Sequence, residues 1–129
     1  MKRSLVLVGV LLSMACSTGG QRVSYTSPQV QAGEQAYQAA CVACHNAELS
    51  GTGDAPALAG RSFASQWDGR PIAELTEFMR DHMPRTIPGM LNDATYVALV
   101  AYLLAMNGVP AGEAPLIFGA PGTIVMGPP

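Results

Sequence analysis

Three residues that lie close together in the sequence, Cys41, Cys44 and His45, constrain the fold more than any other feature. They belong to the string CVACH, in which two cysteines are three positions apart and a histidine follows the second one. On one turn of helix, this spacing presents both thiols and the imidazole to the same neighbouring group. The fold must therefore build a site that takes all three side chains from a single turn of chain.

The spacing favours covalent attachment of haem. Each thiol can bond one vinyl group of a haem, and the adjacent imidazole then reaches the iron, as in the c-type haem motif. A zinc site is less favoured, because it needs four ligands and only His82 remains to complete it. A thioredoxin-like dithiol needs a preceding strand, whereas residues 32–40 have a helical composition. A disulfide between the two cysteines would close too small a loop to contribute much stability. We therefore expect one covalently bound haem c.

The N-terminus has the layout of an export signal followed by a lipid attachment site. Residues 1–15 combine a positive start, a short apolar run and a small residue before Cys16. The apolar run is too short to span a bilayer. Residues 12–16 resemble a bacterial lipobox, with Ser13 where leucine is usual. We expect lipidation of Cys16, because it explains why an exported protein carries an unpaired cysteine; ordinary cleavage with a soluble product is the alternative.

The charge of the chain excludes nucleic acid as a partner. Removal of the signal leaves five arginines and no lysine against nine acidic residues, and a duplex-binding surface needs a basic patch.

We expect an exported, periplasm-facing protein that is held on a membrane by acyl chains on Cys16. Its docking onto redox partners should be weak and transient.

Composition divides the chain into four parts. Residues 17–31 are rich in Ser, Thr, Gly and Gln and show no apolar period, as in a flexible tether. The end of the chain is punctuated by Pro and Gly. We expect, in chain order, a signal peptide, a lipidated flexible tether, one folded domain and a tail, over residues 1–15, 16–29, 30–114 and 115–129.

Apolar periodicity predicts an all-α fold. Asn92 or Asp93 can cap the last helix, and Gly108 can end it. Residues 46–70 contain Gly and Pro without a sustained apolar period, which predicts an irregular segment wrapped on a rigid group. Residues 82–91 are expected to form an extended loop. Helices are expected over residues 30–43, 71–80 and 93–107.

A haem iron that carries electrons takes a second axial ligand, and methionine in that position raises the reduction potential. Met83 and Met90 both fall in the loop 82–91. Met83 is favoured, because Pro84 restricts it towards extended geometry. His82 is the rival ligand and would lower the potential. Neighbouring side chains of extended backbone point apart, so only one of His82 and Met83 is expected to bind.

The residues then resemble one known family, the class I c-type cytochromes, over about residues 30–114. Trp67 through Gly112 are similar, more specifically, to the small cytochromes and cytochrome domains that accompany quinoprotein (PQQ) dehydrogenases. The features that carry the resemblance occur in the family's order: Gly33 and Tyr37, Cys41-x-x-Cys44-His45, Gly51-x-Gly53-x-x-Pro56-x-Leu58-x-Gly60, Met83-Pro84, and Tyr96 and Tyr102.

The resemblance implies three to four helices wrapped around one haem, with the helix at Gly33 crossing the last helix at Tyr102. It also implies a set of haem-binding residues with different roles. They are His45 and Met83 as iron ligands, Pro56 as carbonyl partner of His45 Nδ1, Leu58 packed on the ring, and Trp67 or Arg61 as partners of the haem propionates.

The implied function is that of a single-electron carrier and not of an enzyme, because an iron with six ligands has no open site for substrate. The expected partners are a dehydrogenase, a quinol-oxidising complex or a terminal oxidase. Three alternatives stay open. The chain could be a haem enzyme or gas sensor with an open axial position, a cytochrome subunit of a dehydrogenase complex, or a non-haem lipoprotein whose motif is a metal or structural site.

Overall fold

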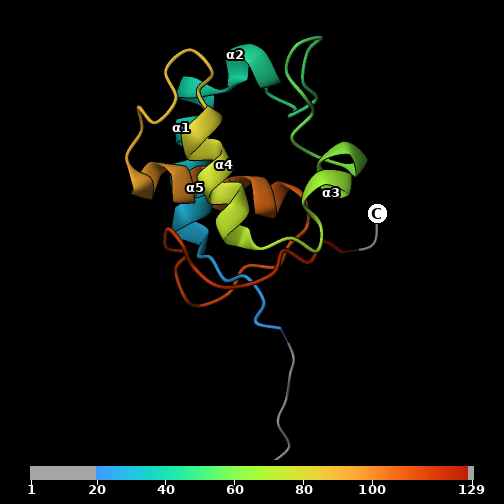
Figure 1. The fold of residues 1–129 in the computed structure, drawn as a ribbon, viewed down its shortest axis with the longest axis vertical. Helices are drawn as coiled ribbons and strands as arrows, with labels where there is room; N and C mark the ends of the chain where they lie inside the picture. Colours follow the sequence, from blue (N-terminus) through green and yellow to red (C-terminus); the bar gives the residue numbers. More distant parts are fainter. Residues whose placement is uncertain (1–19, 128–129) are drawn as a thin grey trace, which may run out of the picture.

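The computed structural model describes residues 20–127, which fold as an all-α protein (Figure 1). Two isolated β-bridges are the extended pairing in this part of the chain, and no helix within it is both long and apolar enough to cross a bilayer. The predicted all-α class is confirmed. The predicted signal peptide and the lipidation of Cys16 lie outside the described residues. The helices in chain order are α1 (Ser27–Ala40), α2 (Val42–His45), α3 (Arg61–Trp67), α4 (Ile72–His82) and α5 (Asp93–Met106).

Two of these helices, α2 and α3, are short pieces that raise the number above the three to four expected. The helix predicted over 30–43 begins earlier, because Thr26 and Gln29 form a capping box. It ends at Ala40, since Cys41 departs from helical geometry with φ −122° and ψ −30°, and the motif continues as α2. The prediction of irregular structure over 46–70 was wrong for α3, because seven residues are too few to show a sustained apolar period.

Helices α1 and α5 cross at backbone contact. Gly33 of α1 is buried, and a Cβ at this position would lie 1.9 Å from the carbonyl oxygen of Ala98 and 2.8 Å from Cβ of Tyr102. One turn further along, the rings of Tyr37 and Tyr102 pack with their centroids 5.4 Å apart. The crossing implied by the resemblance is therefore present, and glycine is what allows it.

Helix α5 is the centre of the core and α4 lies across it. Residues 96–104 of α5 are all buried, which is typical of a helix covered on every side. Its start follows the prediction, because the side chain of Asn92 accepts a hydrogen bond from the backbone N–H of Thr95. Helix α4 is amphipathic and buries Ile72, Leu75, Thr76 and Met79.

The N-terminal part of the described chain differs from the predicted tether. Val23 and Tyr25 are buried, with 7% and 1% of their surface exposed. The hydroxyl of Tyr25 donates to the carbonyl of Val109, and its own carbonyl accepts from the N–H of Gly112 at 2.9 Å. The composition of residues 20–26 is polar, but two apolar side chains and these distant partners are enough to fold the segment onto the protein.

The predicted tail also packs on the protein, where residues 109–127 form what we call the C-terminal strap. Leu116 and Ile124 are buried in the strap, and Leu116 makes two hydrogen bonds with the side chain of Gln29 in α1. Thr123 donates to Gln21 at 3.0 Å, and Ile124 donates to Arg70 at 2.9 Å. The strap therefore joins the N-terminal segment to the loop that precedes α4.

We predict that Gly33→Ala destabilises the protein by about 1–3 kcal/mol, because the added methyl group forces α1 and α5 apart. Urea unfolding of the parent protein and of Gly33→Ala measures the difference in the free energy of unfolding. Gly53→Ala is the matched control, since a Cβ at Gly53 meets no atom within 4 Å. Equal losses of stability in both variants would contradict the close crossing.

Candidate haem site

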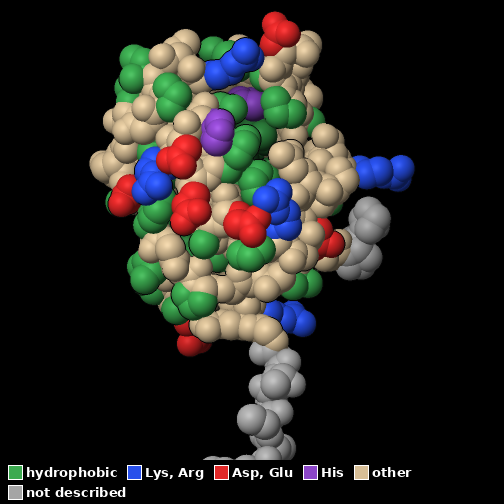
Figure 2. Space-filling model, viewed as in Figure 1, with side chains coloured by type: hydrophobic (Ala, Val, Ile, Leu, Met, Phe, Trp, Pro, Cys, Tyr) green, Lys and Arg blue, Asp and Glu red, His purple; other side chains and the backbone are tan. Residues whose placement is uncertain are grey.

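A cavity of about 800 Å³ opens beside α2 and contains most of the residues singled out in the sequence. Its walls come from α2, from residues 52–58, from α3 and α4, from residues 83–86 and from Leu103 of α5. Figure 2 shows the two histidine side chains close together on this face of the molecule, among hydrophobic side chains. Segments far apart in the sequence therefore meet around a single apolar space.

The motif forms one helical turn, as its spacing predicts. The N–H of His45 donates to the carbonyl of Cys41 at 2.9 Å, and both cysteines and the histidine line the cavity. His45 is buried, Cys41 is half-buried and Cys44 is exposed, and both thiols are free. Burial raises the pKa of the Cys41 thiol to about 11. Two free thiols and an imidazole at one wall are the groups that covalent haem attachment requires.

The imidazole of His45 is held by the backbone of the next loop. Its Nδ1 lies 2.9 Å from the carbonyl oxygen of Pro56, and because a carbonyl only accepts, Nδ1 is the ring nitrogen that carries the proton. This leaves the lone pair of Nε2 free to bind a metal, and the hydrogen bond increases the basicity of the ligand. The contact that the resemblance implied for Pro56 is present.

The loop that carries Pro56 folds back on the motif through local polar contacts. The hydroxyl of Thr52 donates to the carbonyl of Cys44 at 3.1 Å, and the N–H of Gly51 donates to the carbonyl of His45 at 3.0 Å. Gly51 has φ +74°, and a Cβ there would lie 2.4 Å from the carbonyl oxygen of Ala55. Glycine is therefore required for the loop to close over the motif.

Met83 lines the cavity, whereas Met90 does not. Met83 is half-buried and extended, with φ −130° and ψ 146°, as the following Pro84 predicts. Met90 lies further along the same loop, and 55% of its surface is exposed to solvent. The structure therefore separates the two methionines that the sequence offered as distal ligands.

His82 also lines the cavity, which corrects the expectation that it and Met83 point to different sides. His82 is the last residue of α4 and is not part of the extended loop, so the alternation of extended backbone does not apply to it. Its ring stacks on Phe78 with centroids 4.5 Å apart, and its Nδ1 lies 3.0 Å from the Phe78 carbonyl oxygen.

Leu58 and Trp67, for which the resemblance implied contacts with the haem ring and the propionates, both line the cavity. The carbonyl of Leu58 accepts a hydrogen bond at 2.9 Å from Asn107, the residue that ends α5. Trp67 is 4% exposed and meets the ring of Phe78 edge-on at 5.4 Å. The guanidinium of Arg70 covers the Trp67 ring at 4.6 Å. These contacts hold the backbone of Leu58 and the ring of Trp67 in place at the cavity.

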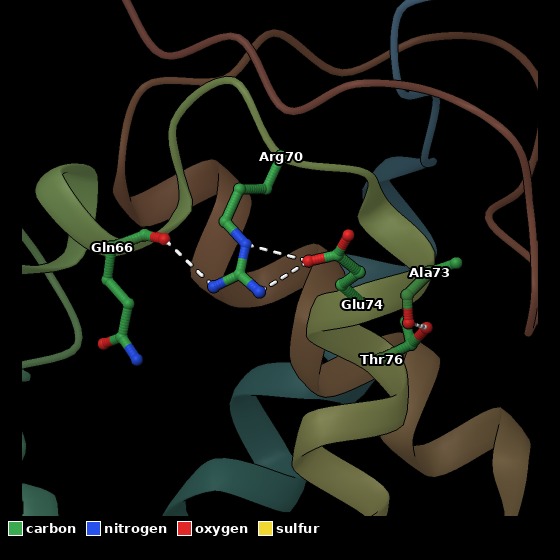
Figure 3. A network of polar contacts seen from close by, with 5 residues as sticks. All are labelled: Gln66, Arg70, Ala73, Glu74 and Thr76. Atoms are coloured by element: carbon green, nitrogen blue, oxygen red, sulfur yellow. Dashed lines mark hydrogen bonds and ion pairs between the residues drawn. The ribbon is translucent and has the colours of Figure 1, made fainter.

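Arg70 is itself held in place by neighbours on either side (Figure 3). It forms an ion pair with Glu74 of α4 at 2.5 Å and donates to the carbonyl of Gln66 in α3 at 3.4 Å. The pair is half-exposed, so its energetic contribution is small. Its effect is on position, because it links the end of α3 to the first turn of α4.

Arg61 is exposed and does not line the cavity, so the structure does not place it as a partner of the haem propionates. Two other polar residues, Gln66 and Arg85, line the cavity. Sequence reasoning missed both, because each is a polar residue without a local pattern. The nearest signal was the position of Arg85 directly after Met83-Pro84.

The residues at the cavity fit a haem. The volume lies in the range of small-molecule sites, the walls are mostly apolar, and the thiols, imidazole and thioether that a haem c uses all reach it. The zinc alternative fits less well, because zinc needs four ligands and no three His, Cys, Asp or Glu residues within residues 20–127 are placed to hold one metal ion.

The family comparison agrees with this geometry. Residues 28–103 match the family model of cytochrome c oxidase, cbb3-type, subunit III. The chain belongs to this family of c-type cytochromes. No curated protein matches the chain. The match runs from the first turn of α1 into α5, and so contains the motif, Pro56 and Met83. It supports a haem-binding electron-transfer cytochrome with covalently bound haem c, in agreement with the class I resemblance.

Tyr37 contacts the residue that follows the motif, and its ionisation makes the stability of the protein depend on pH in the alkaline range. Its hydroxyl donates to the carbonyl of Asn46 at 2.6 Å, directly after His45. Burial is the main cause that raises the pKa of Tyr37 from 10.0 to about 12. The folded protein therefore holds this proton more tightly than the unfolded chain. The resulting stability is complete below pH 10 and is lost as the pH rises through 12.

We predict that Tyr37→Phe is less stable than the parent at neutral pH, because the hydrogen bond is lost, but that it loses less further stability between pH 10 and pH 12. Urea unfolding of both proteins across this pH range gives, for each, the slope of the free energy of unfolding against pH. Parallel slopes would show that Tyr37 does not hold its proton as described.

Proposed function

We propose that this protein is a monohaem cytochrome c that carries single electrons in a periplasmic respiratory or dehydrogenase-linked chain. The observation that carries the proposal is the single cavity in which Cys41, Cys44 and His45 meet Met83. The number of haems rests on the sequence, which contains one Cys-x-x-Cys-His string. A bound haem supplies an iron that gains and loses one electron.

The residues of the chain determine how this iron would be used. His45, oriented by Pro56, and Met83, which lines the same cavity, are the residues that would hold the iron. With both positions filled, no site is left for a substrate, which favours a carrier over a haem enzyme or gas sensor. The thioether of methionine and the apolar walls both favour a high reduction potential.

The proposed partners follow from the family and from the surface. The family model is named for a subunit of a terminal oxidase, which supports a respiratory oxidase as acceptor. The resemblance to cytochromes that accompany quinoprotein dehydrogenases supports a dehydrogenase as donor, with a quinol-oxidising complex as the alternative donor. The chain after the export signal has no lysine, so we propose transient contacts with neutral or basic surfaces.

A stable place in a complex is the second candidate function. It is favoured by the family description, which names an oxidase subunit. Gentle solubilisation of native membranes distinguishes the two. A free carrier separates at its own mass, whereas a subunit stays with a larger haem-containing assembly.

We predict that the protein made with the haem-attachment machinery retains its haem after denaturation. The oxidised form should show the weak red absorption band of methionine-to-iron ligation. Met83→Ala should lose this band, and its ferrous form should bind CO. Met90→Ala is the matched control, because Met90 lies in the same loop but outside the cavity, and it should keep the band.

Other outcomes would overturn parts of the proposal. A parent protein that is already high-spin and binds CO would favour an enzyme or sensor with an open axial position. Loss of the low-spin spectrum only in His82→Ala would make His82 the distal ligand. A protein without covalent haem would end the cytochrome proposal and favour a metal or structural role for the motif.

We also propose that Cys16 carries a lipid anchor that holds the protein on the periplasmic side of a membrane; the support is the lipobox-like sequence before it. We predict that Cys16→Ser moves the protein from the membrane fraction to the soluble periplasmic fraction. Ser13→Leu restores the usual lipobox residue and should stay on the membrane. If Cys16→Ser stays in the membrane fraction, as Ser13→Leu should, the proposed lipid anchor is contradicted.

A further inference from the structure

One hydroxyl of α5 reaches the residue that we propose as the distal ligand. Tyr96 lies near the start of α5 and is fully buried. Its hydroxyl donates a hydrogen bond of 2.7 Å to the backbone carbonyl oxygen of Met83. An apolar ring would fill the same space, so the hydroxyl is present at the cost of burying a polar group, which its hydrogen bond offsets.

The loop that begins at Met83 has few other attachments. Residues 85–90 are all exposed. The hydrogen bonds of residues 84–90 stay within the loop, from Ile87 to Pro84 and from Met90 to Ile87. Among the hydrogen bonds of the described chain, the one from Tyr96 is the link between residues 83–91 and α5. The loop is therefore held at its two ends, by the hydrogen bond of Tyr96 at its first residue and by the packing of Leu91 against the core at its last.

The backbone of Met83 is held on both sides of its side chain. Its N–H donates to the carbonyl of Met79 at 2.8 Å, which ends α4, and its carbonyl accepts from Tyr96. With both polar groups of the backbone bonded, the direction of the Cα–Cβ bond is set by two different helices. The side chain of Met83 is at the cavity.

We propose that Tyr96 is a positioning residue for the distal side of the haem, acting through the backbone of Met83. The inference rests on the proposed function of Met83 as iron ligand. The hydroxyl of Tyr96 keeps the thioether at the cavity, and without it the loop opens more often and exposes the sixth coordination position. Tyr96 therefore resists replacement of methionine by external ligands.

The test compares three holoproteins in the ferric state. Tyr96→Phe removes the hydroxyl and keeps the ring. Tyr25→Phe is the matched control, because it removes another buried tyrosine hydroxyl that donates to a backbone carbonyl, that of Val109, and Tyr25 does not line the cavity. Imidazole is the probe ligand, and the red absorption band and the reduction potential are recorded beside it.

In Tyr96→Phe we expect a weaker red band, a lower reduction potential and imidazole binding that is tighter by about tenfold, as the loss of one hydrogen bond to the loop allows. Tyr25→Phe should lose stability but keep the band, the potential and the imidazole affinity of the parent. A general loss of stability would change both variants alike, so only a positioning role separates them.

Two results would overturn the inference about Tyr96. The first leaves the proposed ligation by Met83 standing, and the second overturns that proposal as well. If the parent shows the red band and Tyr96→Phe matches Tyr25→Phe in all three measurements, Tyr96 has no positioning role and the proposed ligation by Met83 still holds. If the parent itself lacks the band, the ligation by Met83 fails, and the role of Tyr96 fails with it.

Discussion

The contact of α1 with α5 at Gly33 is the constraint on which the rest of the structure depends. Helix α1 leads directly into the motif, and α5 supports the walls on either side of it: Asn107 holds Leu58, and Tyr96 holds Met83. The distance between the haem attachment turn and both walls is therefore set by how closely two helices approach. A methyl group at Gly33 would collide with the backbone at Ala98, so the small size of one residue determines the width of a site that it does not line.

The sequence was informative where a local pattern has a direct physical cause. The spacing of Cys41, Cys44 and His45 predicts a helical turn with three groups on one side, and the structure has it. Periodicity and a capping residue placed α5 to within a residue, because Asn92 acts on backbone groups only three positions away. Pro84 predicted the extended backbone of Met83 by direct steric contact.

Sequence reasoning was weaker where a residue owes its position to a distant partner. Tyr25 lies in a polar segment and gives no sign that its hydroxyl bonds to Val109 at the other end of the chain. The expectation for Arg61 came from the family order alone, whereas the direction of an exposed arginine depends on the helix that carries it. The break at Cys41 also has no local signal in the sequence, since alanines lie on both sides of it and neither glycine nor proline interrupts residues 34–45.

The C-terminal strap determines how a force on the N-terminal segment is distributed over the protein. Figure 1 shows the first described residues at the end of the molecule that lies away from α2. There, Gln21 bonds to Thr123, and the neighbouring Ile124 bonds to Gly69 and Arg70. A pull on the N-terminal segment is therefore shared with the loop before α4 and does not reach α1 alone. The strap therefore divides a load on the leading end of the chain between α1 and the loop before α4, so that the turn that carries Cys41 and His45 receives only part of it.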